Sequence, residues 1–361
     1  MDLEKFLPFT SGKQRLFDII IYNAACNMKC KYCFGEHSQN IRNSCTTQLN
    51  VKKLDKALES VPKNRTGQVT IWGGEPLFNK TQLIDTVSYI KDRFPNAEIN
   101  MMINGSLLND YWTRYLIDNK IFIGISHDGP GQKYRGFDFL ESDSIKNNIV
   151  LLRKYNLFNS FNSIFHKQNP LVKDIHDYFK KKEDEMGVKL GTSPRLIRYI
   201  NSASIPYLFG PEDYHFLDDN AEYIVRFYMR SLLNNDSISI DKMLGRPIKE
   251  AITYTLAKIT KRPFPFIKDI PYCGTTFYPK VTIEGDKVFC NGITERGDLA
   301  EAKRLLTNYK SWNKCISCEY NSICHGICAA LTHEQLEKNC NMYKYFYSKL
   351  EEQLLYFMEA R

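Results

Sequence analysis

Three cysteines lie close together in the stretch "CNMKCKYCF", residues 26 to 34. They are Cys26, Cys30 and Cys33, and they follow the apolar run "LFDIIIY" (16–22), which predicts a strand that ends where the thiols begin. Four thiolates would close a tetrahedral metal site. Three leave two interpretations open. One is a zinc site completed by Cys45 or His37, and the other is an iron–sulfur cubane with one iron free to bind another molecule.

A second stretch, "VTIWGGEP" (69–76), predicts a strand that ends in two glycines, a carboxylate and a proline. Gly73 and Gly74 would let a ligand approach the backbone closely. Glu75 offers an acceptor for an ammonium group. The simpler interpretation is an ordinary turn, because Gly-Gly before Pro is a common turn signal.

Seven further cysteines gather in the last quarter of the chain. The stretch "VTIEGDKVFC" (281–290) predicts a hairpin that turns at Gly285-Asp286 and ends at Cys290. Cys273 precedes it, and Cys315, Cys318, Cys324, Cys328 and Cys340 follow it. Eleven cysteines in all, an odd number without an export signal, favour metal ligation in a reducing compartment over disulfides. We therefore expect a cytoplasmic protein, with a zinc ribbon as the alternative for this region.

Taken together, the three-cysteine loop and "GGEP" resemble the radical S-adenosylmethionine (SAM) enzymes. The cysteine pattern behind them resembles the SPASM extension of that superfamily, and the resemblance covers nearly the whole chain. It implies a [4Fe–4S] cluster on Cys26, Cys30 and Cys33 that binds the amino and carboxylate groups of SAM. It also implies two auxiliary [4Fe–4S] clusters, three in total. One would be held by Cys315, Cys318, Cys324 and Cys340, and the other by Cys273, Cys290 and Cys328.

The second auxiliary cluster lacks a fourth cysteine, because seven cysteines serve two clusters that need eight. Sulfatase maturases have an eighth cysteine, which lies six residues before the one that corresponds to Cys273. This chain has Ile267 at that position. We expect the missing ligand to be Asp269 or another oxygen donor, a water, or a substrate thiolate. Cys45 is left over and is expected to have no function.

The resemblance also implies contacts to SAM. Tyr32 would pack near the adenine. Asn104 and Ser126 would meet the ribose or the carboxylate, and Arg135 would meet the carboxylate. Gly73, Gly74 and Glu75 would bind the amino group. The alternative for Asn104, Ser126 and Arg135 is a turn residue or a surface charge. No catalytic residue is identified, although His127, His166, His215, Asp128 and Tyr199 are conceivable bases.

The elements between these motifs alternate between strand and helix patterns. Strands are expected over 98–103, 121–126, 157–165 and 195–200, with helical periodicity between them. Repeated strand–helix units predict an α/β fold with a parallel sheet, and the resemblance implies a partial (β/α)6 barrel. Polar residues at the strands' carboxyl ends mark the expected active-site edge. The expected domains are the barrel (1–200), a helical connecting segment (201–265) and a SPASM domain with a C-terminal helix (266–361).

Composition excludes several classes of protein. At 361 residues, with 43% hydrophobic and 25% charged residues, the chain is globular rather than disordered. The start lacks a signal peptide, and no apolar stretch is long enough to span a membrane. The net charge of +8 is dispersed, and "KKKEDE" (180–185) reads as a solvated helix face, so a nucleic-acid partner is not expected.

The implied function is a radical SAM oxidoreductase that cleaves SAM reductively to a 5′-deoxyadenosyl radical and abstracts hydrogen from a substrate. A peptide or protein substrate, oxidised or crosslinked, is the leading hypothesis, with flavodoxin or ferredoxin as reductant. Sulfatase maturation is less expected, because Asn291 stands where those enzymes have a basic aspartate. Two further hypotheses are the modification of a small molecule or nucleotide and a non-enzymatic zinc module. About 15 residues precede the first strand, so a leader peptide would be held by the barrel, the 202–261 segment or another protein.

Overall fold

The structure is a computed structural model that describes residues 15–21, 26–33, 48–197, 202–234, 244, 246–259, 279–286, 317–320 and 333–359. Strands and helices alternate along its first half, as the hydrophobic periodicity predicts. The order is β1 (Arg15–Ile21), α1 (Val51–Ala57), β2 (Gly67–Gly73), α2 (Lys80–Arg93), β3 (Ala97–Ile103), α3 (Asp110–Asp118), β4 (Phe122–Ser126), α4 (Asp143–Lys154), β5 (Phe158–Phe165), α5 (Val172–Met186) and β6 (Thr192–Leu196).

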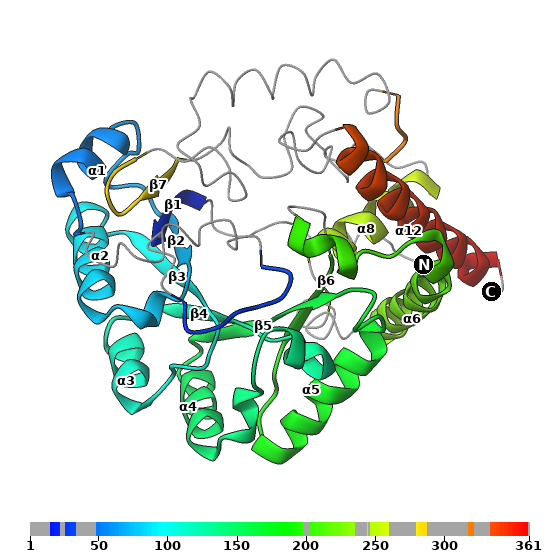
Figure 1. Cartoon of the computed structure of the whole chain (residues 1–361), viewed down its shortest axis with the longest axis horizontal. Coiled ribbons are helices and arrows are strands. Elements are labelled where there is room, and N and C mark those ends of the chain that lie inside the picture. Colours follow the sequence, from blue (N-terminus) through cyan, green and yellow to red (C-terminus); the bar gives the residue numbers. More distant parts are fainter. Residues whose placement is uncertain are drawn as a thin grey trace.

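The strands form one parallel sheet in the order β6-β5-β4-β3-β2-β1-β7, where β7 is Lys280–Thr282. The sheet curves into an open arc with helices α1 to α5 along its outer side, which confirms the predicted partial barrel (Figure 1). Parallel strands bring their carboxyl ends to one edge. The residues that follow β1, β2, β3, β4 and β5 therefore meet there.

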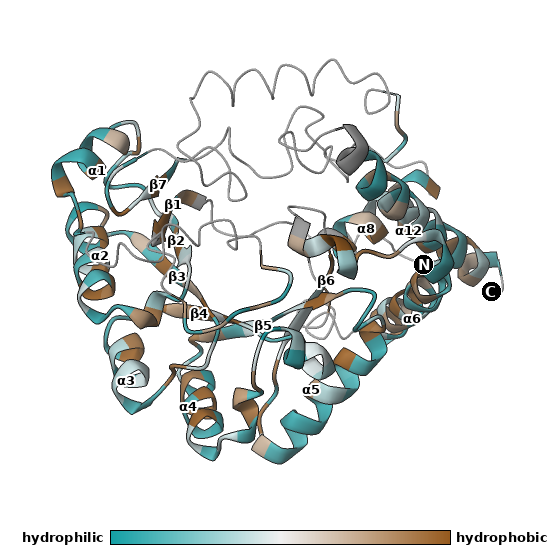
Figure 2. Cartoon of the chain, viewed as in Figure 1, coloured by the Kyte–Doolittle hydropathy of each residue, from teal (hydrophilic) through white to brown (hydrophobic). Residues whose placement is uncertain are grey.

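The two faces of the sheet differ in burial. Residues of the outer face lie in register and are fully buried under the helices, such as Ile71, Met101 and Ile123. They meet apolar helix positions such as Leu83, Val87 and Ile90 of α2. The helices are largely hydrophilic on the side away from the sheet (Figure 2). This layer is the hydrophobic core that fixes the positions of the strand ends.

Two of the outer helices begin at an asparagine whose side chain accepts a hydrogen bond from a backbone N–H group of the first turn. The Asn79 side chain accepts from the backbone N–H of Gln82 at the start of α2, over 3.1 Å. The Asn109 side chain accepts from Trp112 at the start of α3, over 3.0 Å. Each cap satisfies a donor that the first helical turn leaves open, and so ends the loop that leaves the sheet edge.

The described residues that follow the barrel are largely helical. Two short 3-10 turns, η6 (Ser202–Tyr207) and η7 (Pro211–Asp213), lead into α6 (Tyr214–Leu233), and α8 (Arg246–Ile259) follows. The long helix α12 (His333–Glu359) packs on α6 and α8 (Figure 1). The hydroxyl of Tyr343 in α12 donates to the carbonyl oxygen of Leu196 at the end of β6, over 3.0 Å.

One strand differs from the sequence prediction. The sixth strand was expected over 195–200, but β6 ends at Leu196 and begins at Thr192, because the backbone of Phe161 to Phe165 pairs with that segment despite Pro194. The hairpin expected over 281–290 starts as β7, whose turn closes with the N–H of Thr282 on the carbonyl of Asp286, over 2.9 Å. Its second strand lies outside the described residues. In the described part of the chain, no helix is both long and apolar enough to cross a membrane.

Candidate functional site

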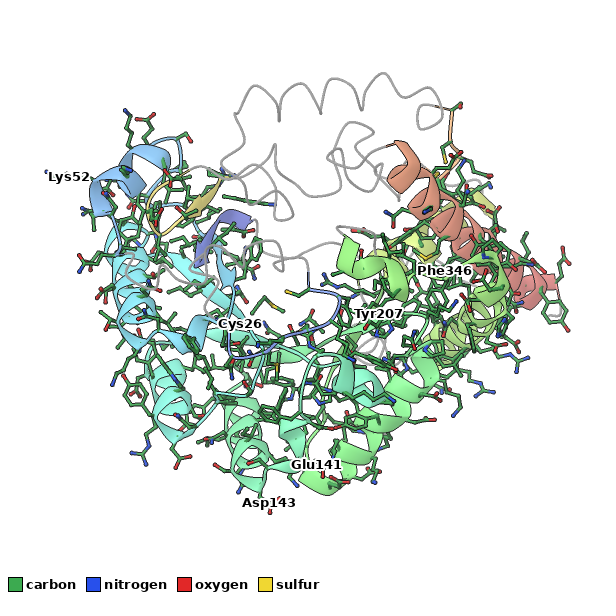
Figure 3. The ribbon with its side chains drawn as sticks, in the orientation of Figure 1. Cys26, Lys52, Glu141, Asp143, Tyr207 and Phe346 are labelled. Atoms are coloured by element: carbon green, nitrogen blue, oxygen red, sulfur yellow. The ribbon has the colours of Figure 1, made fainter. Side chains whose placement is uncertain are left out.

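The three-cysteine loop follows β1 and lies at the carboxyl edge of the sheet. Cys26, Cys30 and Cys33 are all thiols and all half-buried, and Figure 3 shows Cys26 inside the arc of strands, whereas Glu141 and Asp143 lie on its outer rim. Burial raises the pKa of the Cys26 thiol, and it raises that of Cys30 to about 11. A metal cation that binds such a thiol stabilises the thiolate and so favours loss of the proton.

Asn104, directly after β3, holds this loop in place. Its side-chain N–H donates to Oδ1 of Asn27 over 2.9 Å and lies 3.7 Å from Sγ of Cys26. Its Oδ1 accepts from the backbone N–H and the hydroxyl of Ser106, over 2.9 and 2.6 Å. Asn27 donates in turn to Ser106 over 2.7 Å. Asn27 and Ser106 were missed by the sequence interpretation, although both adjoin residues that it singled out.

Glu75 lies at the end of β2 with its carboxylate fully inside the protein. One oxygen accepts from the backbone N–H of Leu77 over 3.0 Å, and the other accepts from Asn104 over 2.6 Å. Gly73 precedes it with φ of +148°, a conformation that favours glycine. Burial raises the pKa of Glu75 to about 7 despite both hydrogen bonds and the nearby Arg135. A carboxylate in this position would be stabilised by a ligand cation.

Tyr32, between the second and third cysteines, is tied to the residues after β4. Its hydroxyl donates to Oδ2 of Asp128, whose Oδ1 accepts from the backbone N–H of Ile164 over 2.8 Å. Nη1 of Arg135 lies 3.9 Å from Oδ1 of Asp128 and 3.4 Å from the Tyr32 hydroxyl. The backbone N–H of Lys31 also donates to the carbonyl of Tyr134, over 2.8 Å. The loop is thereby fixed against the segment 128–136.

The histidines beside the site have structural partners. Nδ1 of His127 accepts from the N–H of Gly129, so its Nε2 carries the proton and donates to Asp138, over 3.0 Å for each. His166 is fully buried, and its ring packs against those of Tyr32, Tyr134 and Tyr207 at centroid distances of 5.1 to 5.3 Å. Burial lowers the pKa of His166 to about 4, so it is neutral at pH 7.

The five candidate bases differ in burial and in whether the structure describes them. His127 and Asp128 are buried in the hydrogen bonds described above, which gives both a structural role. His215 is exposed on α6. Tyr199 lies outside the described residues, as do Cys45, His37, Ile267, Asp269 and Asn291. The same holds for five predicted cluster ligands: Cys273, Cys290, Cys315, Cys324 and Cys328.

All seven residues predicted to contact SAM lie at one edge of the sheet. Tyr32 follows β1, Asn104 follows β3, and Ser126 ends β4. Gly73 and Gly74 are half-buried beside Glu75, and Arg135 ends a 3-10 turn, η4 (Gly129–Tyr134). The structure thus brings these seven residues together. Their contacts with SAM remain predictions.

The described residues fit an iron–sulfur cluster with SAM. Within the described ranges, no three His, Cys, Asp or Glu side chains converge on one ion position. A [4Fe–4S] cluster needs no such convergence, because each cysteine binds a different iron. For the zwitterionic end of SAM, Glu75 supplies a buried negative group and Arg135 a buried positive one. Nε of Arg135 is buried and has no partner among the described residues.

The amino-acid sequence is similar to a known protein family and to several known enzymes. The family described as a 4Fe-4S single cluster domain matches residues 14–123. The radical SAM cyclopropyl synthase TigE of Paramaledivibacter caminithermalis is 22% identical over 95% of this chain and 75% of its own length. The cysteine-type anaerobic sulfatase-maturating enzyme of Clostridium perfringens is 25% identical over 60% of this chain and 61% of its own length.

Solved structures agree on the fold. The structure of anSMEcpe with bound AdoMet superposes with a TM-score of 0.66 and 17% identity, over 96% of each chain. The structure of anSMEcpe with AdoMet and the Cp18Cys peptide gives a TM-score of 0.64 over 96% of this chain and 99% of the other. At this level of identity the similarity concerns the fold alone.

Proposed function

The chain belongs to the radical SAM enzymes, with the fold of their maturases, and we propose that its substrate is a peptide or protein that it oxidises or crosslinks. SAM and a reduced [4Fe–4S] cluster together supply a radical that abstracts hydrogen from an unactivated carbon. The observation that carries the proposal is the three-cysteine loop held at the carboxyl edge of an open sheet, beside a buried carboxylate and a buried guanidinium.

The chain's own residues bind and orient the cofactors. Cys26, Cys30 and Cys33 would hold the cluster, and Asn104 would fix the loop through Asn27. Glu75 would accept a hydrogen bond from the SAM amino group, and Arg135 would donate to its carboxylate. Tyr32 would pack near the adenine, with its hydroxyl held by Asp128. Ser126, at the end of β4, would meet the ribose or the carboxylate.

The inner face of the sheet supports a peptide substrate. Asn100, Ser126, Asn162 and Ser193 all lie on this face and are only half-buried, and Arg195 beside them is exposed. Asn162 is oriented by a 3.4 Å hydrogen bond from Nη2 of Arg195. Amide and hydroxyl side chains can pair with both the N–H and the carbonyl groups of a peptide backbone. This face would therefore hold an extended polar chain near the cysteine loop.

The test is mass spectrometry of peptides encoded beside the gene for this protein. Each should lose two hydrogens per modification after incubation with the reconstituted enzyme, SAM and dithionite. Formation of 5′-deoxyadenosine without any change in these peptides would refute the peptide proposal and favour a small molecule or nucleotide. The variant Asn162→Leu should lower peptide modification more than uncoupled SAM cleavage, because Asn162 belongs to the substrate face.

Sulfatase maturation is the second candidate, favoured by relatives with that activity, such as the Clostridium perfringens enzyme. This activity requires a proton acceptor directly after the cysteine that corresponds to Cys290. Asn291 occupies that position here, and its amide cannot act as a proton acceptor. A cysteine-containing sulfatase-motif peptide should therefore remain unmodified. Its conversion to the aldehyde would establish this function instead.

We further propose an acidic one-electron donor, such as flavodoxin or ferredoxin. Lys31 and Lys133 are exposed beside the cysteine loop and lie 5.9 and 5.3 Å from the ring centre of Tyr134. The variant Lys31→Glu/Lys133→Glu should slow SAM cleavage driven by flavodoxin and leave the dithionite-driven reaction unchanged. A matched control is Lys181→Glu on α5, an exposed lysine on the outer side of the sheet.

A further inference from the structure

Two opposite charges are buried beside the three-cysteine loop. The side chain of Asp128 is fully buried and that of Arg135 is 13% exposed, with 3.9 Å between Oδ1 and Nη1. Both also contact the Tyr32 hydroxyl, which donates to Asp128 and lies 3.4 Å from Nη1 of Arg135. Tyr32 adjoins Cys33, so this charge pair is linked to the loop by a single side chain.

The pair acts electrostatically on the thiols. The backbone N–H of Lys31 donates to the carbonyl oxygen of Tyr134 over 2.8 Å, so the residue after Cys30 is held directly against the segment that carries Arg135. Burial lowers the pKa of Arg135, but Asp128 and all three thiols raise it, and the net shift is upward. Glu75 is the other buried charge here, and it interacts with Cys26 and with Arg135. Solvent screens these interactions poorly because the groups are buried.

We infer that Asp128 and Arg135 tune the reduction potential of the cluster proposed at Cys26, Cys30 and Cys33, with opposite signs. One-electron reduction adds a negative charge to the cluster. A buried cation nearby stabilises the reduced state, and a buried anion destabilises it. With both present, the two effects oppose each other, and the potential depends on the balance between them. Asp128 is thus a tuning residue as well as the partner of the Tyr32 hydroxyl.

The test is an EPR-monitored dithionite titration of the reconstituted holoenzyme at pH 8, without SAM. Asp128→Asn keeps the shape, and its amide can still pair with the N–H of Ile164 and with the Tyr32 hydroxyl. We expect this variant to shift the midpoint potential upward. Arg135→Gln should shift it downward, and the double variant should lie between the two. Arg135→Lys, which keeps the charge, should restore most of the wild-type value.

Two controls separate charge from structure. Tyr32→Phe removes the hydrogen bond to Asp128 without changing a charge, so its shift measures the effect of a looser loop. Cluster signals that do not respond to SAM serve as an internal reference, and their potentials should not move in any variant.

The inference rests on the proposed function, but the two fail differently. If no cluster signal of the wild type changes on addition of SAM, the proposed cluster site is wrong. If that signal is present, this inference is overturned in either of two cases. In the first, Asp128→Asn and Arg135→Gln shift its potential in the same direction. In the second, both shifts stay within that of Tyr32→Phe.

Discussion

At the scale of single residues, the site combines a buried anion and a buried cation beside three thiols. Glu75 and Arg135 come from segments 60 residues apart, and the curved sheet brings them to one edge. Each carries a charge that burial would normally exclude, since the cost of desolvation is high. A zwitterionic ligand offsets that cost for both groups, which is the physical basis for assigning this edge to the amino and carboxylate groups of SAM.

Glu75→Ala should weaken SAM binding. A charge-assisted hydrogen bond to the SAM amino group contributes about 1.5–3 kcal/mol, so the affinity should fall by about one to two decades. The measurement is isothermal titration calorimetry of the reconstituted protein with SAM. The control is Glu98→Ala on β3, whose carboxylate pairs with Gln68 away from the sheet edge. An unchanged SAM affinity in Glu75→Ala would return "GGEP" to the status of a simple turn.

His166 should make the protein sensitive to acid. Its pKa is about 4 in the fold, below its ordinary value of 6.5, so the unfolded chain takes up the proton first as the pH falls. Its contribution to stability is complete above pH 6.5 and is lost as the pH falls toward 4. Between pH 7 and 5 this loss amounts to about 2 kcal/mol. Denaturant unfolding of His166→Gln should show a smaller loss of stability over this range than the wild-type protein does.

The sequence predicted the position of the site better than its internal contacts. Strand ends can be read from apolar runs, so the common edge of Tyr32, Glu75, Asn104 and Ser126 was foreseeable. The pairing of Asp128 with Tyr32 joins positions 96 residues apart, and no local pattern contains it. Asp128 was considered only as a base, because its burial depends on the packing of β5 against β4.

At the scale of elements, the loop after β3 depends on one glycine. Gly105 has φ of +82°, and a Cβ there would lie 2.6 Å from Cζ of Phe139 and 2.8 Å from Cγ2 of Ile125. Its neighbours Asn104 and Ser106 hold the three-cysteine loop through Asn27. The conformation of this glycine therefore determines where the cysteines lie.

Gly105→Ala should destabilise the protein by about 3 kcal/mol or more, from backbone strain and overpacking together. It should also lower the cluster content after reconstitution. Gly187→Ala is the matched control, because Gly187 also has a positive φ, +65°, but nothing lies within 4 Å of the added Cβ. It should cost only about 1 kcal/mol. Equal losses of stability in the two variants, measured by denaturant unfolding, would contradict the packing argument.

Strand boundaries were predictable where apolar runs are strong, as in β3 and β4. They were not in β6, where the apolar stretch "LIRYI" indicated a later strand than the one that pairs with β5. The three-residue β7 is too short for any periodicity to show. Its place beside β1 follows from tertiary pairing, which the sequence of the hairpin does not reveal.

At the scale of the whole molecule, the proposed auxiliary clusters involve cysteines that lie beyond the barrel in the sequence. Of the predicted auxiliary ligands, Cys318 and Cys340 lie in the described part of the chain, and neither forms a disulfide. Cys340 lies on α12, the helix that packs against α6 and donates to the end of β6. Cys340 therefore lies on a helix that contacts the barrel directly.

The proposed three clusters predict about 12 iron atoms per chain after anaerobic reconstitution. Cys26→Ala/Cys30→Ala/Cys33→Ala should lower this by about four, and the auxiliary signals should persist. Iron and sulfide analysis with EPR is the measurement. Zinc in place of iron would contradict the assignment, and so would loss of all iron in a variant that still folds.

The most direct test of the central claim is reductive cleavage of SAM by the anaerobically reconstituted protein. With dithionite as reductant, the wild-type protein should form 5′-deoxyadenosine and methionine in equal amounts. The variant Cys26→Ala/Cys30→Ala/Cys33→Ala, with its auxiliary clusters intact, should form neither. If the wild-type protein carries a full complement of clusters and forms no 5′-deoxyadenosine, or if the variant forms as much as the wild type, the assignment of the three-cysteine loop is wrong.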